Sequence, residues 1–156
     1  MTPLHRTREP SRRGFQGSGG IDDDAVSPRA YDLSREGRAD ILMVRVIDAR
    51  TGSIKSRLKA PQDSVGRIKI TADGRRAIID SDSSKDVWVY DVRTKALIGT
   101  IKTSAEHKVL TVSADGRRAF LTNPDADSVT VVDIKAGREI GQFKTGHRPD
   151  GIAWVE

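Results

Sequence analysis

Apolar and polar residues alternate along much of the chain after residue 60. Val65–Ile70 reads as such an alternating stretch, with the two-residue period of a half-buried strand. In Asp86–Asp91 the alternation places two valines on one face, with Trp88 and Tyr90 on the other. The pattern therefore predicts short strands of a sheet that is buried on at least one side.

Turn signals separate these stretches. Asp73-Gly74 supplies the positive φ that a tight hairpin needs, and Arg76–Ile79 follows as the return strand. The polar loop Asp80–Lys85 precedes the next strand. Arg93–Lys95 then turns the chain into a fourth strand, Ala96–Lys102. Four antiparallel strands are therefore predicted within about 42 residues.

The predicted four-stranded unit occurs twice in the sequence. Ala72–Ala77 returns as Ala114–Ala119 with identical residues, and Val87–Asp91 returns as Val129–Asp133, both at an offset of 42 residues. A period of ~40–45 residues built from short strands is typical of a β-propeller blade. The second copy predicts strands at Val109–Val112, Arg118–Thr122, Ser128–Asp133 and Glu139–Lys144.

Weaker copies extend the pattern in both directions. Val44–Asp48 and the turn Thr51-Gly52 match the third strand of the unit, and Val26–Tyr31 matches its first two strands without the Asp-Gly turn. Gly151–Val155 aligns with Val109–Ser113 at the same offset of 42. The predicted division is an arm over 1–20, a degenerate first blade over 21–60, a second blade over 61–102, a third over 103–144, and the first strand of a further blade over 145–156.

The motif is specific enough to suggest a family. Ala114–Asn123 followed by Ser128–Asp133 resembles the YVTN-type β-propeller repeat of bacterial proteins, with Phe120–Asn123 standing where that motif has Tyr-Val-Thr-Asn. Gly146–Ala153 is similar to the family's link into the next blade. The resemblance implies an all-β, incomplete propeller of antiparallel four-stranded blades. It leaves two interpretations open: a truncated piece of a longer propeller, or two chains joined head to tail into a ring of about six blades. WD40 repeats have a similar length, but no Trp-Asp dipeptide closes a unit.

Composition excludes several classes of protein. The chain has 156 residues and no cysteine, so it can form neither disulfides nor thiolate metal sites. No apolar run approaches the ~20 residues that span a bilayer, and no apolar region of a signal peptide follows Met1. Residues 1–20 are rich in Arg, Gly, Ser and Pro, and we expect them to be a disordered arm. The net charge of +5 is dispersed and lacks interleaved aromatics, which disfavours nucleic acid as a partner.

Candidate binding residues lie in the loops that precede each first strand. In a propeller these loops share one rim, where ligands commonly bind. His107 and His147 occupy near-equivalent repeat positions and could bind a metal or act as an acid–base pair. The alternative is that both are solvated loop residues, and no third ligand recurs with them, so we predict no metal site. The candidate ligand-binding residues are Asp63, Glu106, His107, His147, Arg148 and Asp150.

Two other acidic patterns favour structural roles. Asp80, Asp82, Ser84 and Asp86 have the spacing of a calcium loop, but Lys85 stands where that loop needs glycine. We therefore expect a turn in which side chains bond the backbone. A second acidic set recurs at the end of each third strand, where carboxylates can accept bonds from the following turn; its members are Asp48, Asp91 and Asp133.

No catalytic constellation accompanies the repeats: neither a Gly-x-Ser-x-Gly motif nor a phosphate-binding loop is present. The leading hypothesis is a non-catalytic binding or scaffold module without a cofactor. It would bind a protein or small molecule on the propeller rim and could self-associate through open blade edges. The resemblance offers an alternative, a lactonase-like or haem- or quinone-linked redox propeller enzyme, or a fragment of one. It also implies a periplasmic or secreted location, although no export signal is visible, so the compartment stays open.

Overall fold

The computed structural model describes residues 29–36, 41–60 and 65–155. The predicted arm over 1–20 and the candidate Asp63 lie outside the described residues. Described residues form three antiparallel sheets of three, four and four strands. The all-β, blade-like fold class predicted from the sequence is confirmed.

The first sheet has three strands in the order β1 (Arg29–Glu36), β2 (Ile41–Asp48) and β3 (Ile54–Lys59). The second sheet has four strands, also in chain order. They are β4 (Ile68–Ile70), β5 (Arg76–Asp80), β6 (Asp86–Asp91) and β7 (Leu97–Lys102).

The third sheet repeats the second. Its strands in chain order are β8 (Val109–Val112), β9 (Arg118–Asn123), β10 (Ser128–Asp133) and β11 (Arg138–Lys144). A 3-10 turn, Pro124–Ala126, joins β9 to β10.

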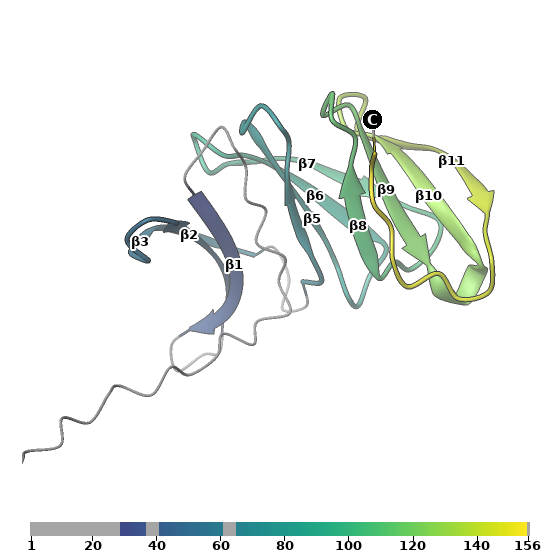
Figure 1. Cartoon of the computed structure of the whole chain (residues 1–156), viewed down its shortest axis with the longest axis horizontal. Helices are drawn as coiled ribbons and strands as arrows, with labels where there is room; N and C mark the ends of the chain where they lie inside the picture. The colour runs from purple at the N-terminus through teal and green to yellow at the C-terminus, as the bar shows by residue number, and fades with distance from the viewer. Residues whose placement is uncertain (1–28, 37–40, 61–64, 156) are drawn as a thin grey trace, which may run out of the picture.

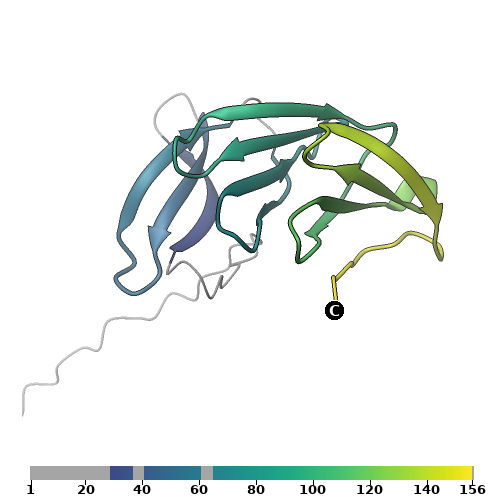
Figure 2. The same cartoon turned by 90° about the horizontal axis from the view of Figure 1, so that it is seen from above.

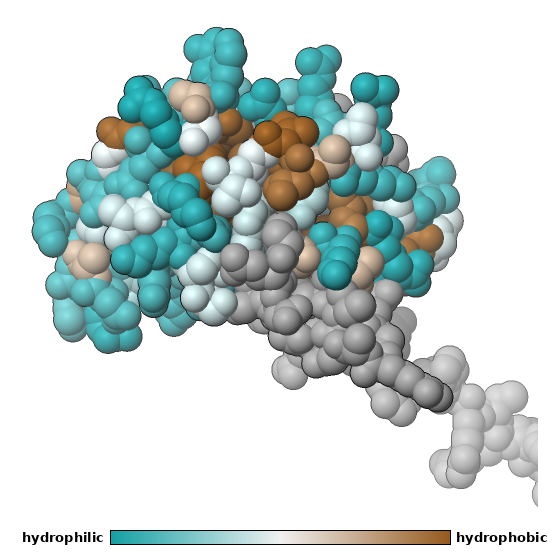
Figure 3. Space-filling model, turned by 180° about the vertical axis from the view of Figure 1, so that it is seen from behind, coloured by the Kyte–Doolittle hydropathy of each residue, from teal (hydrophilic) through white to brown (hydrophobic). Residues whose placement is uncertain are grey.

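The three sheets stand side by side in an arc (Figures 1 and 2). On the inner side of the arc, β1 lies against β4 and β4 lies against β8. The outermost strands are β3, β7 and β11. Figure 3 views this outer side, where patches of apolar residues stand among hydrophilic ones. The exposed large apolar residues of these outer strands are Ile54, Leu97, Ile98, Ile140 and Phe143.

Alternation along β6 builds both cores of the arc. Trp88 and Tyr90 pack against the first sheet, whereas Val87 and Val89 pack against the third. Because the second sheet is covered on both faces, five successive residues of β6, Asp86–Tyr90, are buried. The assignment of these side chains to opposite faces, made from the sequence, is confirmed.

Two predicted strands differ from the structure. The first strand of the second sheet begins at Ile68 rather than Val65. The preceding backbone is held instead by the end of β5, where the Gly66 N–H donates to the Asp80 carbonyl at 3.0 Å. Gly151–Val155 forms no strand with the other described residues. Trp154 instead stacks on Phe120 of β9, with ring centroids 5.3 Å apart.

Candidate functional site at the loop edge

Up-and-down strand order gives each sheet two different edges. The hairpin edge carries the connections from first to second and from third to fourth strands, which in the four-stranded sheets are Thr71–Arg76, Val92–Ala96, Ser113–Arg118 and Ile134–Gly137. The loop edge carries the connections from second to third strands and from one sheet to the next, which are Val65–Arg67, Ser81–Lys85, Thr103–Lys108, Pro124–Asp127 and Thr145–Asp150. All the predicted candidate residues that are described belong to the loop edge.

On the hairpin edge, the two Asp-Gly hairpins have the same bonds. The Thr71 hydroxyl donates to Asp73 at 2.6 Å and accepts the Arg76 N–H at 3.0 Å. Ser113 repeats both bonds with Asp115 and Arg118, at the same two distances. The hydroxyl hydrogen bond holds the pKa of each aspartate below its ordinary value.

The turns after the third strands are equally well satisfied. Asp48 accepts the Thr51 N–H at 3.1 Å, and Asp133 accepts the Ala136 N–H at 2.7 Å. Asp91 accepts both the N–H and the hydroxyl of Thr94, at 2.7 and 2.9 Å. The structural role predicted for these three recurring aspartates is confirmed.

Asp80 makes the loop edge different. Its side chain is fully buried at the end of β5, where Oδ1 accepts the Arg67 N–H and Oδ2 has no partner. Burial, and secondarily the charge of Asp82, raises the pKa of Asp80 to about 7. A Cβ at Gly66 would lie 2.8 Å from Asp80 Oδ1, so a larger residue there would force the carboxylates of Asp80 and Asp82 to shift.

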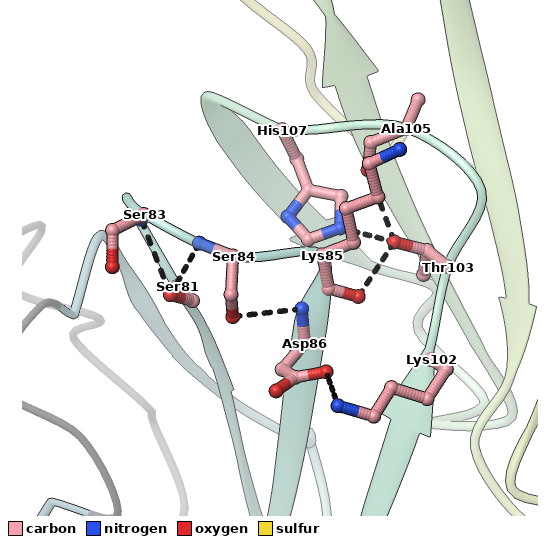
Figure 4. Close-up of polar contacts among 9 residues, drawn as sticks. All are labelled: Ser81, Ser83, Ser84, Lys85, Asp86, Lys102, Thr103, Ala105 and His107. Atoms are coloured by element: carbon pink, nitrogen blue, oxygen red, sulfur yellow. Dashed lines mark hydrogen bonds and ion pairs between the residues drawn. The ribbon is translucent and has the colours of Figure 1, made fainter.

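The loop after Asp80 is a turn held by serines. The Ser81 hydroxyl accepts the N–H groups of Ser83 and Ser84, at 3.2 and 3.0 Å (Figure 4). Ser84 accepts the Asp86 N–H, and Asp86 pairs with Lys102 at 2.6 Å. The part of the chain that the structure describes holds no group of three His, Asp or Glu side chains suited to a metal.

His107 is not solvated. The residue is only 6 % exposed, and Nε2 lies 2.6 Å from the Thr103 hydroxyl (Figure 4). Because that hydroxyl also faces the carbonyls of Lys85 and Ala105, its single proton goes to a carbonyl and Nε2 is the donor to oxygen. Nδ1 is then a buried acceptor without a partner. Burial lowers the pKa of His107 to about 4, despite the opposing charges of Asp86 and Glu139.

Asn123 is the third buried group of this kind. Its amide nitrogen donates to Ser128 at 3.0 Å and to Thr130 at 2.8 Å, while Oδ1 has no partner. It occupies the repeat position of Ser81, 42 residues earlier. The sequence pattern predicts a turn at Asp80 and no role for the Asn123 side chain. The available signal for these two residues is that both break the repeat. Asp80 stands where the next unit has Thr122, and Asn123 stands where the preceding unit has Ser81.

The remaining candidates form an exposed group beside the 3-10 turn. Asp127 accepts the Arg148 N–H at 2.8 Å and lies 3.2 Å from His147 Nδ1. Arg148 also pairs with Asp125 at 3.4 Å, and Lys108 pairs with Asp150 at 3.1 Å. The two histidines therefore bond to different partners. Glu106 is exposed.

Comparison with known proteins places the chain by its fold. No protein-family model matches the sequence, and no curated protein matches it either. The structure is similar to a chain of the Kuenenia stuttgartiensis hydrazine synthase, with a TM-score of 0.63 and 20 % sequence identity. The match covers 80 % of this chain and 36 % of that one. This likeness shows the arrangement of strands alone. Among the described residues, no helix is long and apolar enough to cross a bilayer.

Proposed function

We propose that the chain is a non-catalytic repeat module of the YVTN type that binds a protein or a small molecule at its loop edge. One observation carries this proposal: Asp80, His107 and Asn123 each keep a buried polar atom without a partner, and all three lie on this edge. Among the described residues, the only other such atom is Ser34 Oγ on β1. Unsatisfied buried polar groups are rare in folded proteins and cluster where function opposes stability.

The exposed group next to these residues supplies the first contacts. His147, Arg148 and Lys108 present donors, and Asp125 and Asp150 present acceptors, in loops that differ between the two four-stranded units. The backbone beneath is the same in both units: the N–H groups of Thr103 and Thr145 each donate to the preceding loop at 2.9 Å. A repeated frame with variable side chains is the arrangement that binding surfaces on rigid scaffolds use.

The test is a screen of a defined metabolite and peptide library by ¹H–¹⁵N amide shifts of the full chain. We expect ligands to shift loop-edge amides, and the double variant His147→Ala/Arg148→Ala to bind at least about tenfold more weakly, near 1.4 kcal/mol. Arg75→Ala/Arg117→Ala removes two exposed arginines from the hairpin edge and should leave affinity unchanged. A screen without ligands, shifts confined to the hairpin edge, or turnover of a lactone would each contradict the proposal.

A further inference from the structure

The third sheet presents to solvent the face that the second sheet buries. In the second sheet, Ile78 and Ile101 are 0 % and 1 % exposed, because this face packs against the third sheet. Phe120 and Phe143 occupy the equivalent positions 42 residues later, with the same register to β10. Phe120 is half-buried, and Phe143 is 49 % exposed. The repeat therefore continues its interior packing face at this end of the arc, which we call the end face.

The end face is uncharged across its centre. Strand pairing gives it side-chain positions from all four strands of the third sheet, which are Thr111, Phe120, Val129, Val131, Gly141 and Phe143. None of these residues carries a charge. An uncharged face can meet a copy of itself without taking an unpaired ion out of water.

The opposite end of the arc has a different chemistry. Tyr31, Val44 and Val46 of the first sheet pack toward the second sheet, and the alternate positions point the other way. Asp32 and Arg45 occupy two of those positions and form an ion pair. Covering an ion pair with an apolar face removes water from both charges and gives them no new partner. A head-to-tail contact between the two ends is therefore disfavoured, and the end face suits its own copy better.

The end face is also shaped as a step. Gly151–Val155 lies over the half that contains β9, where Trp154 stacks on Phe120 with ring centroids 5.3 Å apart (Figure 1). The half that contains β11 is shallower, because Gly141 has no side chain and nothing lies within 4 Å of its Cβ position. A ridge on one half and a shallow area on the other fit together when a second copy is turned by 180° about an axis parallel to the strands.

We propose that the end face is a homodimer interface in which two copies meet about such a twofold axis. Trp154 of each copy then lies over Gly141 and Val131 of the other copy, beside Phe143. Trp154 and Val155 are 45 % and 83 % exposed in the single chain, and both lose water in this contact. Buried aromatic side chains supply much of the binding energy in protein interfaces.

The expected dimer is weak and closed. Four strands about 4.8 Å apart and about 20 Å long make a flat face of roughly 400 Å². This is about half of the ~800 Å² per partner in an interface of standard size, so we expect a dissociation constant on the order of 100 μM. Because the contact uses the same face of both copies, it leaves no second end face for a third copy.

Sedimentation of the full chain over a concentration series tests the dimer. The mass should rise from 17.1 kDa toward twice that value between about 10 μM and about 1 mM. Phe143→Ser and Val155→Asp should each weaken the dimer at least tenfold, and Val155→Asp changes a side chain that the monomer leaves in solvent. Ile98→Ser is the matched control, because Ile98 is 53 % exposed on β7, outside the end face, and should leave the dimer unchanged.

A nitroxide label tests the geometry, since the natural chain has no cysteine. Lys135→Cys places the label at an exposed position of the turn between β10 and β11. Mixed with ¹⁵N-labelled natural chain, the labelled variant should broaden the amides of the Asp115-Gly116 hairpin in the other copy. The reason is that the proposed axis brings the two hairpin edges together and places each β11 half over a β9 half.

Four results would each overturn the proposal. They are a monomer at about 1 mM, equal weakening by Ile98→Ser and Phe143→Ser, a ladder of higher oligomers, and broadening confined to the first sheet, which would indicate a head-to-tail contact. None of them bears on ligand binding at the loop edge, which is measured separately on the dilute monomer.

Discussion

The hairpin edge and the loop edge stand on the same strands but use polar side chains in opposite ways. On the hairpin edge, Thr71 and Ser113 repeat one bonding scheme, and each aspartate carboxylate accepts hydrogen bonds from a hydroxyl and from a backbone N–H. On the loop edge, Asp80 and Thr122 occupy equivalent positions, yet one is a buried carboxyl with an unpartnered oxygen. Uniform bonding stabilises the repeat, whereas the variable edge leaves buried polar atoms unpaired at the edge where we propose that a ligand binds.

The largest expected effect concerns Asp80. Because its pKa in the folded protein is about 7, well above the ordinary 3.8, the folded state keeps a proton that the unfolded state has released. This contribution to stability is full below about pH 4 and is lost as pH rises through 7. Asp80→Asn should therefore raise the free energy of unfolding by about 2 kcal/mol at pH 8, measured by urea denaturation. Equal stability of variant and wild type at pH 8 would contradict the burial of an unpaired carboxylate.

The contribution of His107 to stability depends on pH in the opposite direction to that of Asp80. Its pKa of about 4 lies below the ordinary 6.5, so its contribution is full above pH 6.5 and is lost as pH falls toward 4. We expect His107→Gln to be less sensitive to acid than wild type, and Asp80→Asn to be more sensitive, between pH 6.5 and 4. Asp115→Asn on the hairpin edge is the control. Because its pKa is lowered, it should match the wild-type profile from pH 5 to 8.

A smaller effect tests the uniformity of the hairpin edge. Thr71→Val and Ser113→Ala each remove a hydroxyl that accepts one backbone N–H and donates to one aspartate. Each should lower the free energy of unfolding by about 1–1.5 kcal/mol, with the two values within about 0.5 kcal/mol of each other. Denaturant titration of both variants measures this directly. Markedly unequal losses would mean that the two hairpins are alike only in geometry.

The smallest effect lies in the turns after the third strands. Lys95 has φ of 61°, where the equivalent Gly52 and Gly137 have 69° and 68°. A side chain is strained in this left-handed region, so Lys95→Gly should stabilise the protein by about 0.5–1 kcal/mol. Gly137→Ala, the reverse change in the next unit, should destabilise it by a similar amount. Loss of stability in Lys95→Gly would show that the lysine stem makes a compensating contact.

Local patterns predicted most of the strands. Asp86–Asp91, Val109–Val112 and Ser128–Asp133 have the predicted bounds, because alternation and Asp-Gly turns act over a few residues. Gly151–Val155 forms no strand with the other described residues, and its place as the first strand of a further blade stays a prediction. Its sequence is that of a first strand, but a strand exists only where a second backbone pairs with it. The predicted repeat boundaries and family remain an interpretation.

The candidate site was less accessible to prediction. Sequence spacing placed His107, His147, Arg148 and Asp150 in loops at one edge, and the structure agrees. The spacing of these residues gave no sign that His107 is buried or that Oδ2 of Asp80 lacks a partner. Whether a side chain is solvated depends on segments that the fold brings together, such as Arg67 against Asp80, which lie on different strands or loops of the second sheet.

The sequence by itself determined the repeating strand unit, its turns and the alternation of side chains, since all of these are properties of neighbouring residues. Only the tertiary structure decided which polar groups lose water and which strands pair with one another. Desolvation and strand pairing arise between segments, and they depend on how the sheets stack rather than on any single stretch of the chain.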